Sequence, residues 1–176
     1  LVEIIEAELN NYKKSFALYD FTDMIEKFIG SELCPKFDVV FIDEAQDLSP
    51  IQWKMYDIIK QNTKIMILAG DDDQAIYGWA GADVQRFQEE PAKEKILPQS
   101  YRVPITVQQV ADSIISQIDT RIMKLWNPRN EEGHCEEVYD LDEVDLTQGK
   151  WLVLARTNYR LIKMKPYLME RGIYFE

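Results

Sequence analysis

The chain contains few of the residues that metal sites and disulfide frameworks need. Among its 176 residues there are two cysteines and one histidine. Cys34 and Cys135 show neither metal-ligand spacing nor a disulfide pattern, which fits a reducing compartment. His134 has no partner in the sequence, and we expect it to be a surface loop residue. The sequence therefore gives no support to a Cys/His metal centre or to a disulfide-stapled fold.

Long apolar runs and targeting signals are missing as well. No run approaches the ~20 apolar residues of a membrane span, and residues 1–6 are acidic and amphipathic, unlike a signal peptide. We therefore expect no membrane partner. The length and the hydrophobic content of 46% predict one globular domain or two small ones. Because the chain begins at Leu1 rather than at methionine, we expect an excised or processed piece.

Basic residues are the third scarcity. Lysine and arginine total 20 against 31 aspartates and glutamates, which gives a formal net charge of −11. A nucleic-acid binder should show a basic footprint, so this charge taken alone argues against one. Phosphate contacts need only a groove of the right sign, however, and part of that groove can lie outside the chain.

The most informative stretch covers residues 37–50. Val39 to Ile42 form an apolar run typical of a strand buried on both faces, and Asp43 and Glu44 follow at its carboxyl end. Open α/β sheets hold their ligands at this end. One carboxylate there could hold Mg²⁺, and the other could orient and deprotonate a water molecule. The alternative is a strand that ends in a solvated acidic loop.

A second strand with an acidic end follows one helix later. Ser49 and Pro50, with Gln52 behind them, predict a capped helix that runs to about residue 60. Residues 64–70 then predict another buried strand, which is followed by Asp71, Asp72, Asp73 and Gln74. Two strands joined by a helix predict a parallel βαβ unit. Both acidic clusters should therefore lie at the same edge of the sheet, where Gln74 could reach a phosphoryl group or its water.

Aromatic residues among small ones follow this second cluster. Tyr77 and Trp79 stand beside glycine and alanine, the composition of a platform on which nucleic-acid bases stack. The alternative is that both are core residues.

The rest of the chain alternates between expected helices and short strands. We expect helices over about 1–14, 20–30, 82–89, 104–118 and 158–171, with Asn158 as a cap and Gly172 as a terminator, a clear buried strand over 151–156, and short strands at 96–97 and 138–139.

Three motifs in order resemble the UvrD/Rep-type superfamily 1 DNA helicases. They are Asp43-Glu44-Ala45-Gln46-Asp47, the stretch from Gly70 to Ala82, and Gln99-Ser100-Tyr101-Arg102. The stretches Asp20-Phe21-Thr22-Asp23 and Ala155-Arg156-Thr157-Asn158 are similar to two further family segments. The resemblance implies an α/β fold of RecA-like parallel sheets flanked by helices. It assigns residues 1–97 to the later part of a first motor domain and residues 98–176 to the start of a second.

The resemblance also implies a role for each matching residue. Asp43, with Glu44, would hold Mg²⁺, and Glu44 would be the general base. Gln74 would sense the γ-phosphate of ATP, Tyr101 would stack on adenine, and Arg102 would reach the γ-phosphate from the second motor domain.

On the DNA side, the resemblance implies that Tyr77 and Trp79 stack on single-stranded bases. The implied function is ATP-dependent movement along single-stranded or partly duplex DNA, with ATP and Mg²⁺ as cofactors, in DNA repair or replication. The implied location is the cytoplasm of a prokaryote or a phage-infected cell.

Several family features are missing from these 176 residues. No Gly-x-x-x-x-Gly-Lys-Ser/Thr loop occurs, so the chain has no phosphate cradle of that type. Ala80 stands where the family often has arginine, and Ser100 and Val103 replace a frequent Asn and Ser. We therefore expect a helicase fragment that alone hydrolyses ATP poorly. The alternatives are a non-catalytic binding module with a helicase-like fold, a helicase–nuclease subunit, and a small Mg²⁺ enzyme, which would leave the two aromatics unexplained.

Overall fold

The computed structural model describes residues 1–31 and 33–175. It divides into two units, Leu1–Glu131 and Glu132–Glu176. The larger unit holds the parallel sheet and every residue that we selected as a candidate site residue. The expected assignment of residues 1–97 and 98–176 to two motor domains stays a prediction.

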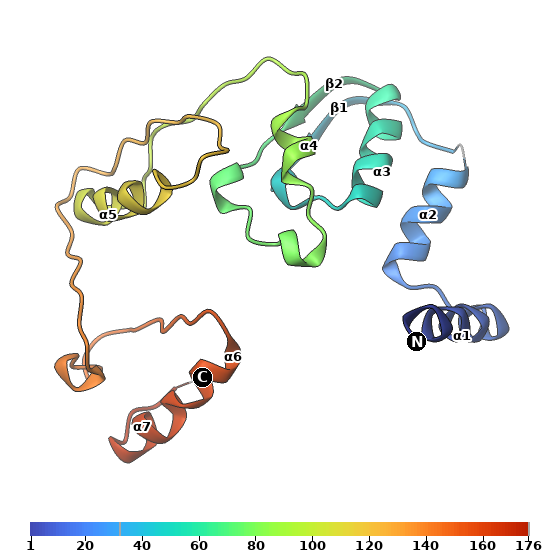
Figure 1. Ribbon diagram of the computed structural model, residues 1–176. Helices are drawn as coiled ribbons and strands as arrows, with labels where there is room; N and C mark the ends of the chain where they lie inside the picture. The colour runs from blue at the N-terminus through green and yellow to red at the C-terminus, as the bar shows by residue number, and fades with distance from the viewer. Residues whose placement is uncertain (32, 176) are drawn as a thin grey trace. The chain divides into compact units, whose positions relative to one another are not determined.

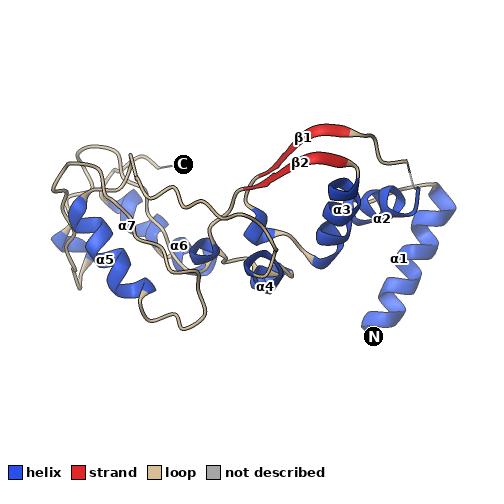
Figure 2. Ribbon diagram, turned by 90° about the horizontal axis from the view of Figure 1, so that it is seen from above, coloured by secondary structure: helices blue, strands red, loops and turns tan. Residues whose placement is uncertain are grey.

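The predicted βαβ unit is present in the larger unit (Figures 1 and 2). Strands β1 (Phe37–Ile42) and β2 (Thr63–Leu68) pair in parallel, from Phe37 opposite Thr63 to Ile42 opposite Leu68. Helix α3 (Pro50–Gln61) connects them. The predicted start of α3 is confirmed, because Ser49 is the N-cap, Pro50 is the first helical residue, and the Ser49 N–H donates to Gln52 Oε1 at 2.8 Å. The chain is thus a mixed α/β protein with a small parallel sheet.

The two strands are covered on one face only, so the prediction that they are buried on both faces is wrong. Figure 2 shows α3 and α4 (Val84–Gln88) on one side of the strand pair. Side chains alternate across a strand, and those on the other face are 40–72% exposed: Val39, Phe41, Ile65 and Ile67. In the described residues the sheet has two strands, and an apolar run favours burial without itself providing the element that would cover it.

A small aromatic core lies beneath α3. Trp53 and Tyr56 are almost fully buried and pack edge to face, with ring centroids 5.1 Å apart. The Tyr56 hydroxyl donates to Glu90 at 2.9 Å, and Glu90 also pairs with Lys60 and Arg86. Burial and the hydrogen bond to Glu90 raise the pKa of Tyr56. These contacts fix α3 against the segment that follows α4.

Helices α1 (Val2–Phe16) and α2 (Phe21–Ser31) precede the sheet, as predicted. Asp20 caps α2, since its Oδ1 accepts from the Asp23 N–H at 2.9 Å. Lys13 of α1 pairs with both aspartates, at 3.0 Å and 2.8 Å, and so holds α1 against the start of α2. Helix α1 has no buried residue, and its apolar side chains are exposed.

Within the larger unit, the chain after β2 is built from short turns and two helices. Three-residue 3₁₀ turns, η2 (Asp72–Gln74) and η3 (Gly78–Ala80), lead to α4, and α5 (Ile105–Ile115) follows a long loop. A similar turn, η1 (Ala45–Asp47), follows β1. The helix predicted over 104–118 is therefore confirmed but shorter. The strand predicted at 96–97 is wrong, since these residues are loop.

The smaller unit differs most from expectation. It contains η4 (Leu141–Glu143), α6 (Asn158–Ile162) and α7 (Met164–Glu170). The strands predicted at 138–139 and 151–156 are wrong, because both stretches are loop, and Leu152 and Leu154 are 82% and 80% exposed.

The cap predicted at Asn158 is one residue too late, since Thr157 is the N-cap. Gly172 has φ +66° after α7, as expected of a terminator. His134 is exposed, as predicted.

None of the helices in the described residues combines the length and the apolar character that crossing a membrane would take.

Candidate nucleotide site

Asp43 and Glu44 lie where the two strands end side by side. The Ala69 N–H donates to the Ile42 carbonyl at 2.7 Å, and the Ala45 N–H donates to the Ala69 carbonyl at 3.0 Å. These bonds continue the pairing of β1 and β2 beyond the last strand residues. The two acidic clusters therefore follow strands at the same edge, as the parallel pattern predicts.

The backbone turns sharply at Glu44. Its φ is +52°, the left-handed region that residues with a side chain rarely adopt. The side chains of Asp43 and Glu44 are exposed, and Asp43 Oδ1 accepts from the Glu44 N–H at 3.0 Å. Hard carboxylate oxygens that remain open to solvent fit a magnesium ion that keeps most of its waters.

Gln46 connects Glu44 to the end of β2, and sequence reasoning missed it. Its side chain is 1% exposed and lies in η1. Its Nε2 donates to Glu44 Oε2 at 2.7 Å, and its Oε1 accepts from the Asp71 N–H at 3.0 Å. The signal for this role in the sequence was the position of Gln46, an amide side chain two residues after Glu44, the general-base candidate.

Gly70 is needed for this connection. A Cβ added there would lie 2.7 Å from Gln46 Oε1 and 2.9 Å from the Phe87 ring. Real Cβ atoms do not approach other atoms so closely. Any residue other than glycine would therefore push Gln46 or Phe87 away from its place.

Gln74 completes a series of hydrogen bonds that starts at Glu44. Its Nε2 donates to Asp71 Oδ2 at 2.7 Å. The series thus runs from Glu44 through Gln46 and Asp71 to Gln74. Two candidate residues from different strand ends are joined in this way by two residues that sequence reasoning had not assigned to the site.

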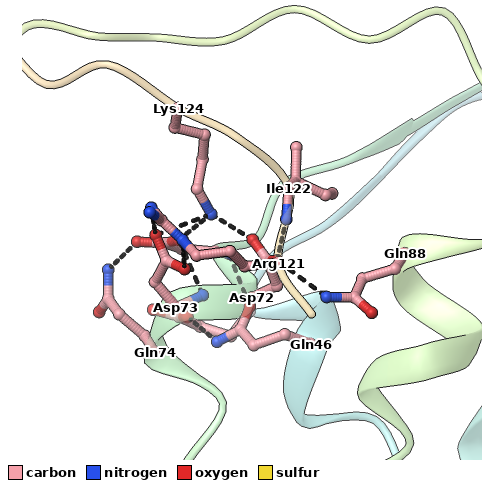
Figure 3. A network of polar contacts seen from close by, with 10 residues as sticks. Gln46, Asp72, Asp73, Gln74, Gln88, Arg121, Ile122 and Lys124 are labelled. Carbon is pink, nitrogen blue, oxygen red and sulfur yellow. Dashed lines mark hydrogen bonds and ion pairs between the residues drawn. The ribbon is translucent and has the colours of Figure 1, made fainter. Parts of the chain in front are cut away.

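Two basic side chains from a distant part of the chain pair with the aspartate turn (Asp71, Asp72 and Asp73) and offset two of its three negative charges (Figure 3). Lys124 Nζ lies 2.6 Å from Asp71 Oδ1 and 3.3 Å from Asp73 Oδ2, and it also contacts Asp72. Arg121 donates to both oxygens of Asp73, at 2.7 Å and 2.6 Å. Oxygens of the three carboxylates lie within 4.8 Å of one another, and the positively charged Lys124 ammonium contacts all three.

The protonation equilibria follow from these contacts. Burial alone would raise the pKa of Asp72, but hydrogen bonds from Lys124, the Ile122 N–H and Gln88 outweigh it and hold the pKa below its usual value. Burial alone would lower the pKa of Lys124, but its bonds to Asp71 and Asp72 raise it. Asp72 and Lys124 are therefore both charged at neutral pH.

Tyr77 and Trp79 lie side by side on the surface after the aspartate turn. Their ring centroids are 6.4 Å apart, and the rings are tilted by 48°. Tyr77 is 46% exposed and Trp79 is 84% exposed. Neither ring is part of a core in this structure.

Tyr101 and Arg102 lie apart from the Glu44–Gln74 series. Tyr101 is 84% exposed, and Arg102 is also exposed. The Ser100 hydroxyl accepts from the N–H groups of Arg102 and Val103, at 3.4 Å and 3.1 Å. In the described residues no hydrogen bond or ion pair joins either side chain to Glu44 or Gln74.

Comparisons with known proteins agree with the motifs. The family model of the UvrD/REP helicase N-terminal domain matches residues 2–95. The chain is 31% identical to the ATP-dependent DNA helicase Rep of Buchnera aphidicola, an alignment that covers 94% of the chain and 31% of that protein. It is 35% identical to DNA helicase II of Haemophilus influenzae, over 61% of the chain and 16% of that protein. It is also 35% identical to the ATP-dependent DNA helicase PcrA of Staphylococcus epidermidis, over 52% of the chain and 13% of that protein.

The chain spans less than a third of the length of these relatives. The family model nevertheless covers more than half of the chain, and it covers both strands, the Gln46 connection and the aspartate turn. The chain belongs to the UvrD/REP helicase N-terminal domain family.

Proposed function

We propose that the chain is part of an ATP-dependent DNA helicase that couples the hydrolysis of Mg²⁺-ATP to movement along single-stranded DNA. Residues 1–97 would be the later part of a first RecA-like motor domain, and residues 98–176 the start of a second. Family membership and the names of the relatives support this proposal. The observation that carries it is the hydrogen-bonded series from Glu44 through Gln46 and Asp71 to Gln74.

The series suits an ATPase site because it connects the Glu44 carboxylate, which follows β1, to the Gln74 amide, which follows β2. Gln46 occupies one oxygen of Glu44, and the other oxygen would take a proton from the attacking water. Asp43 would hold Mg²⁺, which, when bound, neutralises charge on the β- and γ-phosphates. Gln74 would leave Asp71 to contact the γ-phosphate or its water.

Tyr101 and Arg102 would act from the second motor domain. Both side chains are exposed, so they are free to meet a nucleotide when the two domains approach. Tyr101 would stack on the adenine. A guanidinium that arrives only on closure stabilises transition-state charge only then, which links hydrolysis to movement.

Tyr77 and Trp79 would bind single-stranded or partly duplex DNA. Their adjacent, exposed rings support a stacking role. The net charge of −11 requires the phosphate contacts to be local or to come from parts of the protein outside this chain.

The test is Glu44→Gln in the full-length protein that contains this chain. We expect ATP binding to persist and DNA-stimulated hydrolysis to be abolished, because the variant cannot accept a proton. The matched control is Asp38→Asn, which removes an exposed strand carboxylate that pairs with Lys64 and lies away from the series. Wild-type turnover in Glu44→Gln would refute the assignment of the base.

A second candidate function is a non-catalytic binding module. It is favoured by the formal net charge of −11. Titration with ATP, with and without Mg²⁺, is carried out on the chain and then on the full-length protein. The result for the full-length protein separates the two candidates. Mg²⁺-dependent binding and turnover at full length support the motor, and their absence there supports the module.

A further inference from the structure

Residues 121–131, here called the linking segment, connect two groups of candidate site residues. The segment lies outside any helix. Its beginning contacts the aspartate turn, which precedes Gln74 directly. Its end pairs with the stretch that carries Tyr101 and Arg102.

The contact at its beginning is buried and ionic. The side chains of Arg121 and Lys124 are each 9% exposed, and those of Asp72 and Asp73 are 1% and 8% exposed. The Ile122 N–H adds a backbone bond to Asp72 Oδ2 at 2.7 Å. Figure 3 shows these groups converging on the turn from the linking segment. Asp71 accepts from Lys124 with one oxygen and from Gln74 with the other, so the ammonium and the Gln74 amide share one carboxylate.

The contact at its end is made by the backbone. The Ser100 N–H donates to the Asn127 carbonyl at 2.8 Å, and the Asn127 N–H donates to the Pro98 carbonyl at 2.8 Å. The Arg129 N–H donates to the Val103 carbonyl, and the Ile105 N–H to the Glu131 carbonyl, both at 2.9 Å. These four bonds enclose Tyr101 and Arg102 on both sides.

Little chain separates the two contacts. From Lys124 to Asn127 there are three residue steps, which span at most about 10 Å. While both contacts persist, the aspartate turn and Gln74 after it therefore cannot move far from the backbone around Tyr101 and Arg102. If Lys124 lost its charge, three carboxylates within 4.8 Å would repel one another, and the turn would be displaced.

We propose that Arg121 and Lys124 are positioning residues for ATP hydrolysis. Through the linking segment, they hold the aspartate turn and Gln74 in a fixed position relative to the stretch that carries Tyr101 and Arg102. This role rests on the proposed function. Neither residue touches the nucleotide. They act through the aspartate turn and make the placement of Gln74 depend on the stretch that carries Arg102.

The experiment uses the full-length protein and three variants. Lys124→Met keeps the aliphatic stem but removes the charge, and Lys124→Arg keeps the charge. Glu90→Gln is the matched control, because the Glu90 side chain is 4% exposed within another ion cluster of the same unit. The readouts are kcat and KM for ATP with single-stranded DNA present, together with the melting temperature.

We expect Lys124→Met to lower kcat by about 10- to 100-fold, with KM changed much less, as for a small misplacement of a catalytic group. Lys124→Arg should restore most of kcat. Glu90→Gln should lower the melting temperature and leave kcat near wild type. A kcat for Lys124→Met as high as that of Glu90→Gln would reduce the cluster to an ordinary stabilising ion pair and overturn the proposal.

Arg121 provides a second test that does not depend on the folding of the Lys124 variants. Arg121→Gln should also lower kcat, and the double variant Asp73→Asn with Arg121→Gln should lose no more than the worse single variant, because one interaction is removed twice. Additive losses would contradict the proposal. The unaltered full-length protein separates the two levels. If it showed no DNA-stimulated ATP hydrolysis, the proposed function itself would fail, whereas normal hydrolysis that persists unchanged in Lys124→Met would remove only the positioning role.

Discussion

Gln46→Leu is the sharpest test of the site, because it alters one buried side chain and nothing on the surface. Leucine has a similar volume, so the packing is largely kept. The substitution removes the bond to Glu44 Oε2 and leaves the Asp71 N–H without its acceptor. A hydrogen bond to a charged group contributes about 1.5–3 kcal/mol, and an unsatisfied buried N–H costs about 1–3 kcal/mol.

The burial of an apolar side chain recovers part of this loss. We therefore expect the free energy of unfolding to fall by about 2–4 kcal/mol. Activity should fall more than stability implies, because the Glu44 carboxylate loses the contact that sets its orientation. A drop in kcat of about 10- to 100-fold is expected for a general base displaced by a fraction of an ångström.

The assay is single-strand-stimulated ATP hydrolysis by the full-length protein, with the melting temperature measured in the same buffer. Gln52→Leu is the matched control. It removes a 2.8 Å bond from the Ser49 N–H at the start of α3 and should lower the melting temperature while kcat stays near wild type. Equal kcat values for the two variants would refute the reasoning that Gln46 orients Glu44.

Three further predictions follow from the same contacts. Gly70→Ala should lower the free energy of unfolding by about 1–3 kcal/mol through overpacking against Gln46 and Phe87, whereas Gly30→Ala, an exposed helical site with nothing within 4 Å of an added Cβ, should be neutral or stabilising in thermal unfolding. Trp79→Ala should weaken single-strand binding by about 1–3 kcal/mol in a fluorescence titration, while Trp79→Phe, which keeps a ring, should lose less; unchanged affinity in the alanine variant would exclude stacking. Burial would raise the pKa of Glu90, but the bonds from Lys60 and Tyr56 outweigh it and lower the pKa. The stabilising contribution of Glu90 should therefore be present at neutral pH and disappear as the pH falls below about 4.5. Glu90→Gln should flatten this part of a plot of melting temperature against pH, and an unaltered plot would contradict the assignment.

Local signals were sufficient for the βαβ unit. The Ser49-Pro50 start with Gln52 specifies a helix from three adjacent residues, and the two apolar runs on either side need only that helix between them to pair in parallel. The edge that gathers Glu44 and Gln74 follows from this topology alone. That part of the site was therefore predictable without any long-range information.

The errors arise where burial depends on distant partners. The run over 151–156 is as apolar as β1. An apolar run indicates only that burial of its side chains would be favourable, and in the described residues no strand pairs with this one. Arg121 and Lys124 lie about fifty positions from the aspartates with which they pair, and isolated basic residues in a loop carry no periodic signal. Gln46 lies within a recognised motif, yet only the packing reveals that its amide is the buried connection.

The backbone at Glu44 brings these observations together. A non-glycine residue with φ +52° is held in a sparsely populated conformation, which persists only where neighbouring contacts over-determine it. Those contacts are present: the Ala45 N–H is fixed to Ala69, and the Glu44 carboxylate is fixed to Gln46. Gln46 in turn depends on Gly70 for room and on Asp71 for its second bond, and Asp71 depends on Lys124 for its charge balance. The strained general-base candidate is therefore stabilised by a series of contacts that ends in the linking segment, which explains why residues so far from it in sequence should influence the orientation of its carboxylate.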